Sequence, residues 1–300
     1  LLEGATKHAD GSVTFCLYAP MKKNVMVVGE WSGLVPNADG VMNYDGDYFW
    51  TTVAASEFTG AEDYAYYYIV DDEINVADPY AKLIFDPWSD NYINQGYPRY
   101  PGLRDFPEKS GNFPLAVYSP NGDGYEWQDG SFKRPAKENL MVYEMLFRDF
   151  TSEQCVETAM AKIPYLKQLG INAVELMPFS EFDGNLSWGY NPTFYFAPDK
   201  YYGRPEMYKE FIDKCHAEGI AVIMDVVLNH VWGVHPWCKM YWDDARSSPA
   251  SNSPFFNVQA PHNFSVGNDW KQENEHVQHY FCDMLKYWVS EYQIDGYRFD

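Results

Sequence analysis

A chain of 300 residues is long enough for two ordinary domains or for one large one. Its hydrophobic fraction of 46% supports a packed core, and 22 basic against 43 acidic side chains give a formal net charge of −21. So acidic a surface repels nucleic acid, and no basic stripe compensates for it, which excludes a nucleic-acid partner. No apolar run reaches membrane-spanning length, so a membrane partner is not expected.

The cysteines argue against a disulfide scaffold or a zinc knuckle. Their number is odd, their spacing is wide, and no C-x-x-C pair occurs. They are Cys16, Cys155, Cys215, Cys238 and Cys282. Reduced, mostly buried thiols are the simpler interpretation. This slightly favours the cytoplasm without excluding a secreted or periplasmic protein, because no signal peptide is recognised but the sequence begins at Leu1 without Met.

Residues 1–115 have an all-β pattern. Short runs rich in Val, Tyr and Phe alternate with Asp-Gly turns, which predicts a small antiparallel, immunoglobulin-like sandwich. The runs are Val13–Tyr18, Asn24–Val28, Tyr48–Val53 and Tyr64–Val70. Prolines and glycines then gather between about 101 and 137, and residues 116–137 are interpreted as a structured linker.

From residue 138 the pattern changes to alternating strands and helices. The apolar runs Met141–Phe147, Ala173–Met177 and Ala221–Leu228 are predicted strands, and Gly296–Asp300 is a fourth. Helices are predicted from Pro205 to His216 and from Val277 to Tyr292, where apolar residues recur at helical spacing. Near-continuous apolar strands separated by helices indicate a parallel sheet covered by helices.

A doubly wound sheet and a (β/α)₈ barrel both fit this alternation. No glycine-rich loop follows the first strand, so a phosphate-binding fold is not indicated. Polar residues instead follow the strands, namely Glu144, Asn229, His230 and Asp300. Because the site of a barrel lies at the carboxyl ends of its strands, residues 138–300 are predicted to form the first half of a TIM (β/α)₈ barrel.

Two segments carry candidate chemistry. In Asp225–His230, an acid inside an apolar strand needs a partner, since an unpaired buried charge is costly. In Gly296–Asp300, Arg298 and Asp300 are two residues apart and share one face, and an Arg beside a carboxylate favours its ionised form. A glycosidase nucleophile must be ionised and positioned in this way. Taken singly, each segment also fits a structural ion pair.

Together the two segments are specific, and the chain resembles glycoside hydrolase family 13, the α-amylase superfamily. Tyr143–Phe150 is similar to the first barrel strand of pullulanases, isoamylases and branching enzymes, although Leu146 stands where those relatives often carry His. Trp188–Pro192 and the Tyr202-Gly203 pair that follows resemble the loop after the second strand. Several N-terminal segments resemble a family 48 carbohydrate-binding module. They are Phe15–Pro20, Val25–Trp31, Tyr48–Trp50 and Asp78–Tyr80.

The resemblance implies roles for individual residues. Asp300 would be the nucleophile that forms a glycosyl-enzyme intermediate, and Arg298 would hold it ionised. Tyr190 would stack on the sugar before the scissile bond, His230 would hydrogen-bond that sugar, and Trp188 would contact the oligosaccharide. Asp225 would be a structural acid supporting the site. Asn229 matches a calcium-ligand position of α-amylases, but many relatives lack that ion, so the expectation is no cofactor, with calcium as the one candidate.

The resemblance also implies that a general acid, Glu, and a second Asp lie beyond residue 300, so that the sequence is cut from a longer protein. The leading hypothesis is a retaining hydrolase of starch- or glycogen-type α-glucans. The alternatives are an α-glucan transferase, such as a branching enzyme, and a non-catalytic glucan-binding protein. Bond preference, α-1,4 or α-1,6, stays open. Residues 181–202 and 231–271 are expected to rim the active cleft, and Trp31 and Trp50 are candidate glucan contacts of the sandwich.

Overall fold

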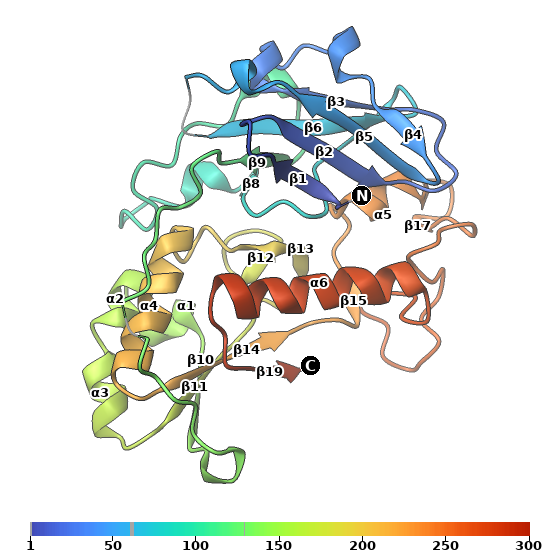
Figure 1. Cartoon of the computed structure of the whole chain (residues 1–300). Helices are drawn as coiled ribbons and strands as arrows, with labels where there is room; N and C mark the ends of the chain where they lie inside the picture. Colours follow the sequence, from blue (N-terminus) through green and yellow to red (C-terminus); the bar gives the residue numbers. More distant parts are fainter. Residues whose placement is uncertain (1, 61–62, 129) are drawn as a thin grey trace.

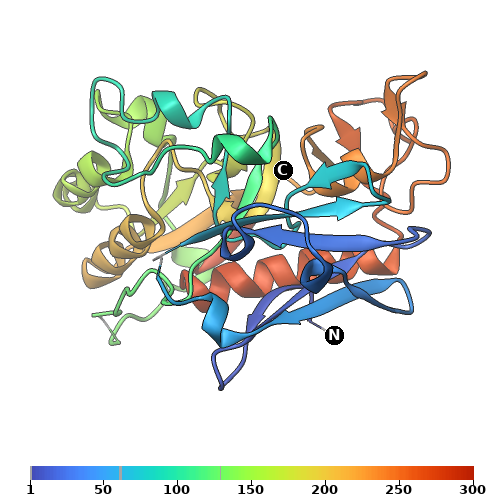
Figure 2. The same ribbon diagram turned by 90° about the horizontal axis from the view of Figure 1, so that it is seen from above.

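The computed structural model describes residues 2–60, 63–128 and 130–300. Its N-terminal part is built from antiparallel sheets, and its C-terminal part combines a parallel sheet with helices (Figure 1). Seen from above, the N-terminal sheets lie over the long helix α6 (Glu275–Glu291) (Figure 2). Within the described ranges, no helix has the length and apolarity to cross a membrane.

Two antiparallel sheets form the N-terminal part. The first has the order β1-β2-β5-β4, and the second has the order β3-β6-β9-β8, with β7 also pairing with β6. Their bounds are β1 Gly4–Lys7, β2 Val13–Tyr18, β3 Val25–Gly29, β4 Asn43–Asp45, β5 Tyr48–Val53, β6 Tyr64–Val70, β7 Ile74–Val76, β8 Ile84–Phe85 and β9 Leu115–Tyr118. Four of these strands match the predicted runs to within one residue. The second sheet includes β9, so it extends three residues past position 115.

Aromatic rings fill the space around Phe15 of β2, which is completely buried. The ring centroid of Phe15 lies 4.8 Å from that of Tyr66 and 5.0 Å from that of Trp31, which stacks on it. Trp31 also meets the edge of Phe58 at 5.5 Å. Trp31, a candidate glucan contact, therefore packs much of its apolar surface inside the N-terminal part.

A four-stranded parallel sheet forms the centre of the C-terminal part, in the order β10-β11-β14-β19. The strands are β10 Val142–Met145, β11 Ala173–Leu176, β14 Ala221–Val226 and β19 Gly296–Phe299. All three neighbouring pairs are parallel. The expectation of adjacent parallel strands from the apolar runs is confirmed.

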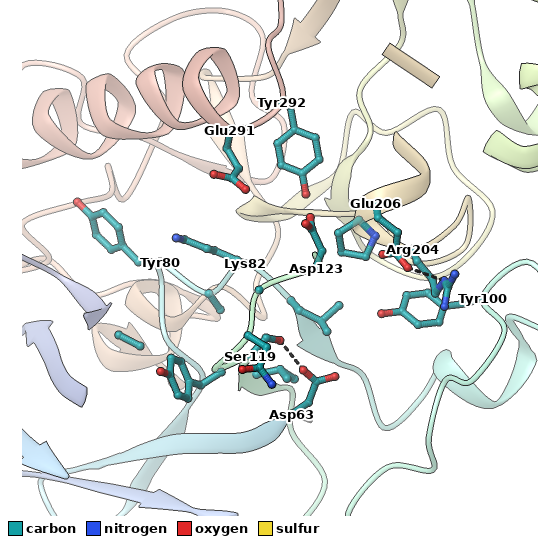
Figure 3. A pocket seen from close by; sticks show the side chains of 18 of the residues that line it. Asp63, Tyr80, Lys82, Tyr100, Ser119, Asp123, Arg204, Glu206, Glu291 and Tyr292 are labelled. Atoms are coloured by element: carbon teal, nitrogen blue, oxygen red, sulfur yellow. Dashed lines mark hydrogen bonds and ion pairs between the residues drawn. The ribbon is translucent and has the colours of Figure 1, made fainter. Parts of the chain in front are cut away.

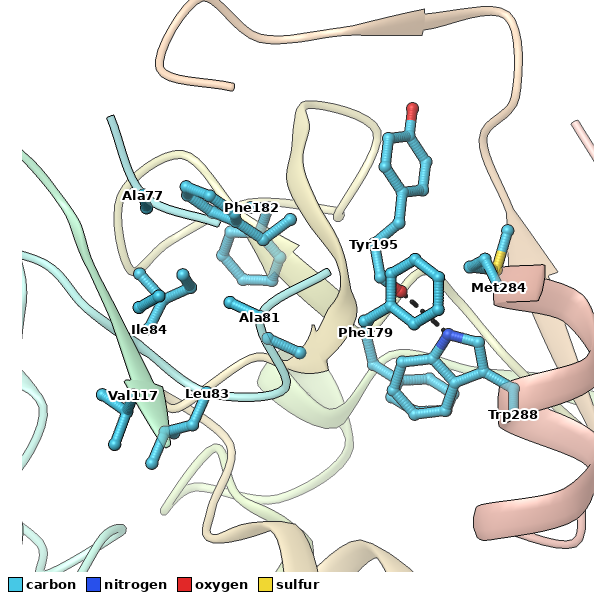
Figure 4. Close-up of a cluster of buried hydrophobic side chains, with 14 of the residues drawn as sticks. Ala77, Ala81, Leu83, Ile84, Val117, Phe179, Phe182, Tyr195, Met284 and Trp288 are labelled. Carbon is cyan, nitrogen blue, oxygen red and sulfur yellow. Dashed lines mark hydrogen bonds between the residues drawn. The ribbon is translucent and has the colours of Figure 1, made fainter. Parts of the chain in front are cut away.

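Helices accompany these strands. They are α1 Phe147–Phe150, α2 Val156–Met160, α3 Ile163–Gln168, α4 Pro205–Ala217 and α6, whereas α5 Pro236–Met240 lies against the N-terminal sheets (Figure 1). α6 is capped by Asn274, the residue before it, whose side chain accepts hydrogen bonds from the backbone N–H groups of His276 and Val277. Its buried face packs against strand β13 (Pro192–Pro198), where the Trp288 indole N–H donates to the Tyr195 carbonyl at 2.9 Å (Figure 4).

Short elements complete the described chain. The strands are β12 Ser180–Phe182, β15 His230–Val231, β16 Trp242–Asp243, β17 Ser248–Pro249 and β18 Asn268–Asp269. The 3₁₀ turns are η1 Glu30–Ser32, η2 Ala38–Gly40, η3 Ala55–Glu57, η4 Asp90–Tyr92, η5 Glu108–Ser110 and η6 Lys137–Asn139. Residues 119–128 and 130–136 run largely without regular structure, and Tyr125 attaches the first of these segments to α4 by donating to Asp213 at 2.7 Å.

The two parts are joined by buried hydrogen bonds. The Tyr280 hydroxyl of α6 donates to the Pro79 carbonyl at 2.8 Å, and the Trp237 indole of α5 donates to the Tyr18 carbonyl at 3.1 Å. Next to Pro79, the buried Asp78 accepts from the hydroxyls of Tyr66 and Tyr68. The bonds from Tyr280 and Trp237 hold the N-terminal sheets against helices α6 and α5 of the C-terminal part.

Candidate active site

The carboxyl ends of β14 and β19 bring three charged side chains together. Asp225 of β14 lies opposite Arg298 of β19 in the parallel register. One guanidinium nitrogen, Nη1 of Arg298, lies 3.1 Å from Oδ2 of Asp225 and 2.5 Å from Oδ1 of Asp300. Strand alternation sends Tyr297 to the opposite face, where its hydroxyl donates to the Leu285 carbonyl of α6. Arg298 thus bridges a buried acid and the acid that follows the strand.

Asp225 is completely buried and has the partners that the sequence requires of it. The Tyr190 hydroxyl donates to its Oδ2 at 2.7 Å, and Arg298 donates to both of its oxygens. Burial raises the pKa of Asp225, whereas the hydrogen bond from Tyr190 and the charge of Arg298 act in the opposite direction. The hydrogen bond to Asp300 raises the pKa of Arg298 further above its ordinary value, so the guanidinium remains a cation.

His230 holds the backbone of Tyr190. Its Nε2 lies 2.8 Å from the Tyr190 carbonyl, and its Nδ1 lies 3.0 Å from the side-chain nitrogen of Asn229. Because a carbonyl can only accept, Nε2 must carry the proton, and Nδ1 then accepts from the Asn229 amide. Both ring nitrogens are therefore engaged within the protein. His230 thereby positions Tyr190 in this structure, and its expected hydrogen bond to a sugar stays a prediction.

Trp188 and Tyr190 lie on the turn of a β-hairpin. Residues 181–202, expected as a loop, contain β12 and β13, which pair antiparallel. Gly189 has φ +92°, and a Cβ there would lie 2.1 Å from the Pro178 carbonyl oxygen, so only glycine fits between the two aromatics. Trp188 is 59% exposed, while Tyr190 turns inward to Asp225. The Trp188 ring is therefore available to a ligand, whereas Tyr190 is hydrogen-bonded to Asp225.

The segment 231–271 has structure of its own. It contains α5, the pair β16–β17 and strand β18, which pairs with β15. The Trp237 ring of α5 stacks on Phe255 at 4.3 Å, and the Tyr241 hydroxyl donates to the Pro20 carbonyl of the N-terminal part. This segment was expected to rim the cleft, and α5 additionally packs on the N-terminal sheets.

Among the described residues, no group of side chains is sufficient to identify a metal-binding site. Asn229, the calcium candidate, uses its amide nitrogen on His230. Carboxylate oxygens of Glu144, Glu175 and Asp225 gather within 4.8 Å of one another at the ends of β10, β11 and β14. Burial, followed by the charges of Glu144 and Asp225, raises the pKa of Glu175. Carboxylate oxygens can coordinate hard cations, but an acidic cluster alone does not define a metal site. Arg298 already neutralises part of the negative charge of this cluster.

A buried network below the hairpin has no counterpart in the sequence interpretation. Lys200, at the end of β13, forms ion pairs with Glu181 of β12 and with Asp90 of the N-terminal part, whose Oδ1 is 3.3 Å away. Asp199 accepts the backbone N–H groups of Phe182 and Tyr201 beside it. All four charged side chains are buried. The sequence of Ala197–Tyr202 does not predict this buried network, because nothing in it distinguishes a buried lysine from an exposed one.

Substituting Tyr190 by Phe tests the link between the hairpin and the charged group. Asp225 would keep Arg298 but lose a hydrogen bond at a completely buried carboxylate. We expect the free energy of unfolding to fall by about 1–3 kcal/mol. Urea denaturation of the variant and the parent measures this. Tyr165→Phe, at an exposed tyrosine of α3, is the control and should leave stability unchanged; equal stability of both variants would contradict the prediction.

Comparison with known proteins agrees with this geometry. Residues 156–272 match the family model of the alpha amylase catalytic domain. The chain is 30% identical over 246 residues to a malto-oligosyltrehalose trehalohydrolase of Saccharolobus solfataricus, covering 80% of this chain and 39% of that protein. The chain belongs to glycoside hydrolase family 13, the α-amylase superfamily. This identification places β10, β11, β14 and β19 in the barrel of that family's catalytic domain.

Other members of the family extend the similarity over nearly the whole chain. A 1,4-α-glucan branching enzyme of Oceanobacillus iheyensis is 28% identical over 307 residues, covering 95% of this chain and 42% of that enzyme. A pullulanase of Paenibacillus barengoltzii, solved with maltotetraose, superimposes with a TM-score of 0.76 at 23% identity, covering 100% of this chain and 48% of that one. At that identity the likeness concerns the fold. The chain spans only 39% and 42% of the length of these two curated relatives.

Proposed function

We propose that the protein is a retaining α-glucan hydrolase whose covalent intermediate forms on Asp300. The observation that carries the proposal is the bridge from Arg298 to Asp300 and to the buried Asp225. Because Oδ1 of Asp300 accepts from the guanidinium, the second oxygen is left to attack an anomeric carbon. The buried Asp225 fixes the guanidinium of Arg298, and thereby the carboxylate of Asp300, at the end of β19.

The reaction would follow the retaining course. The carboxylate of Asp300 forms a bond to the anomeric carbon as the glycosidic C–O bond breaks, and the departing oxygen takes a proton from a general acid. The family resemblance puts that acid beyond residue 300. Water, activated by the same group as a base, then releases the sugar with retained configuration. The displacement needs carboxyl groups and no cofactor. The exposed Trp188 beside the site suits stacking on a sugar face.

An α-glucan transferase is the second candidate, supported by the similarity to a branching enzyme over 95% of this chain. The first half-reaction would be identical, and a sugar hydroxyl would replace water in the second. Product analysis of the full-length protein on starch, pullulan and glycogen separates the two. A hydrolase releases new reducing ends in step with bond cleavage, whereas a transferase changes branching with almost none. Absence of both products would contradict the proposal.

We further propose that the N-terminal sheets form an immunoglobulin-like module of carbohydrate-binding family 48. The antiparallel pairing of β1–β9 and the segment Phe15–Pro20 support this assignment. The measurement is glucan affinity of the full-length protein with and without substitution at Trp50, a half-buried residue of β5. Unchanged affinity would leave Trp50 without a role in binding.

A further inference from the structure

Asp295 lies just before β19, at the end of the strand away from Asp300. Its backbone N–H donates to the Val222 carbonyl at 2.9 Å, and its side-chain Oδ2 accepts from the Val222 N–H at 2.8 Å. Asp295 therefore binds both backbone groups of one residue of β14. We propose that Asp295 is a positioning residue, which sets the register of β19 on β14 and thereby places Arg298 and Asp300. The proposal rests on the proposed function for the role of Asp300.

The chain enters β19 through a turn. Glu291 and Tyr292, at the end of α6, line a cavity of about 550 Å³ together with Asp123 (Figure 3). Gln293 then has φ +52°, a left-handed conformation of the kind that ends many helices. Because the helix ends here, its own ladder of hydrogen bonds does not extend to β19, and pairing with β14 begins at Asp295.

The register that Asp295 sets is the one that the charged group needs. Val222 and Asp295 are 73 positions apart, and so are Asp225 and Arg298. Backbone hydrogen bonds of a parallel pair can form in any register, and the face of β19 that carries Arg298 has no apolar side chain to select one. A slip by two residues would move the guanidinium about 7 Å along β14. Its contact of 3.1 Å with Asp225 would then be lost.

His216 fixes where the Asp295 carboxylate can lie. This ring, at the end of α4, donates from Nε2 to the same Oδ2 at 2.7 Å, because a carboxylate oxygen can only accept. Both side chains are buried, with 3% and 7% of their surface exposed. Phe132 stacks on the ring at 4.1 Å, and Nε of Arg134 lies 3.5 Å from the second oxygen of Asp295. A strand that slipped along β14 would leave the imidazole buried without this partner, which is unfavourable.

The place of the pair also suits a role in stability alone. His216 and Asp295 lie at the amino ends of the strands, whereas the site of a barrel lies at the carboxyl ends. A residue that only stabilises the fold changes the amount of folded protein, but a positioning residue also changes the reaction of the molecules that are folded. A misplacement of about 1 Å in an active site can lower a rate by about 100-fold. The two roles are therefore separable by experiment.

Asp295→Ala in the full-length protein removes both side-chain hydrogen bonds. The substrate is whichever of starch, pullulan and glycogen the unmodified protein cleaves. We expect kcat per folded molecule to fall by about 10- to 100-fold. KM should change little, since Trp188 and the hairpin stay in place. Asp295→Asn keeps an oxygen for Val222 and His216, so it should retain most of kcat.

A substrate with an activated leaving group isolates the first step of the reaction. The fluoride of an α-maltosyl fluoride departs without a general acid, so the rate of its release in a single turnover reports attack by Asp300. This rate should fall in Asp295→Ala and recover in Asp295→Asn. A purely structural role would leave it unchanged in both folded variants.

Asp213→Ala is the matched control for stability. Asp213 of α4 is buried as well, and its Oδ2 accepts from the Tyr125 hydroxyl and from the Gln128 N–H, each at 2.7 Å. The control should melt at a lower temperature, as Asp295→Ala should, and keep its kcat per folded molecule. An unchanged kcat in Asp295→Ala, or an equal loss of kcat in Asp213→Ala, would overturn the proposal.

His216→Ala decides the question if Asp295→Ala does not fold. It leaves Asp295 bonded to Val222 but releases the carboxylate from α4, so kcat should fall while KM stays the same. A folded His216→Ala protein with the kcat of the parent would also overturn the proposal. Failure of the proposed function has a different signature, namely an unmodified protein that cleaves no α-glucan or an Asp300→Asn protein that stays active.

Discussion

Replacing Asp300 by Asn in the full-length protein is expected to lower turnover on α-glucans by at least ~10³-fold. The amide has the size of the carboxylate and can still accept from Arg298, but it lacks the charge that attacks the anomeric carbon. Stability should change little. The ion pair of Arg298 with Asp300 is more than one-third exposed on both sides, and pairs of that kind contribute about 0–1 kcal/mol.

Activity and thermal unfolding measured on the same preparation separate catalysis from structure. If Asp300 served only as a structural ion pair, the variant would melt at a lower temperature and keep its activity per folded molecule. Glu210→Gln is the control, since Glu210 forms a comparably exposed ion pair with Lys214 on α4, away from Asp300. A folded, near-fully active Asp300→Asn protein would end the mechanism proposed here.

Much of the barrel part follows from local patterns. The apolar runs fix β11 and β14 because buried parallel strands need apolar side chains on both faces, whereas β10 is an edge strand of the described sheet and only Met145 in it is buried. The helix predicted to begin at Val277 begins at Glu275, and the difference comes from the capping side chain of Asn274, which acts before the apolar stripe starts. Alternation also suffices to place Arg298 and Asp300 on one face.

The sequence does not predict contacts between segments that lie far apart along the chain. The spacing within Asp225–His230 does not reveal that the Tyr190 hydroxyl is the partner of Asp225, because that contact joins residues 35 positions apart. The hairpin β12–β13 was taken for a loop for a related reason: Pro192–Pro198 is buried throughout, so no alternation marks it as a strand. Likewise, the aromatic ring of Trp31 suits sugar stacking and core packing equally, and only its place on Phe15 separates the two.

The buried lysine of the hairpin leads to the largest expected effect on stability. Lys200→Met should lower the free energy of unfolding by about 3–5 kcal/mol at pH 8, because it leaves the buried carboxylates of Glu181, Asp90 and Asp199 without their cation. Methionine has nearly the same length and keeps the packing of the stem. The loss therefore reports the charge rather than a cavity.

The same variant should be much less destabilised at pH 5. Burial raises the pKa of Asp90, Glu181 and Asp199, and the charge of Lys200 opposes that rise. A carboxyl group with a raised pKa in the folded state contributes stability that is present below its unfolded pKa of about 4 and is lost as the pH rises through the folded pKa. Removing Lys200 raises the folded pKa values further, so protonation relieves the variant at pH 5 and no longer does so at pH 8.

Urea denaturation of the parent and of Lys200→Met at both pH values gives the difference in the free energy of unfolding directly. Lys214→Met provides the reference, because Lys214 forms an exposed ion pair with Glu210 on α4 that contributes about 0.3–0.5 kcal/mol. The difference between parent and Lys200→Met should grow from pH 5 to pH 8, whereas that of Lys214→Met should stay small at both. Since Asp90 belongs to the N-terminal part and Glu181 to the hairpin that carries Trp188 and Tyr190, a pH-independent loss would mean that Lys200 joins these parts by packing alone.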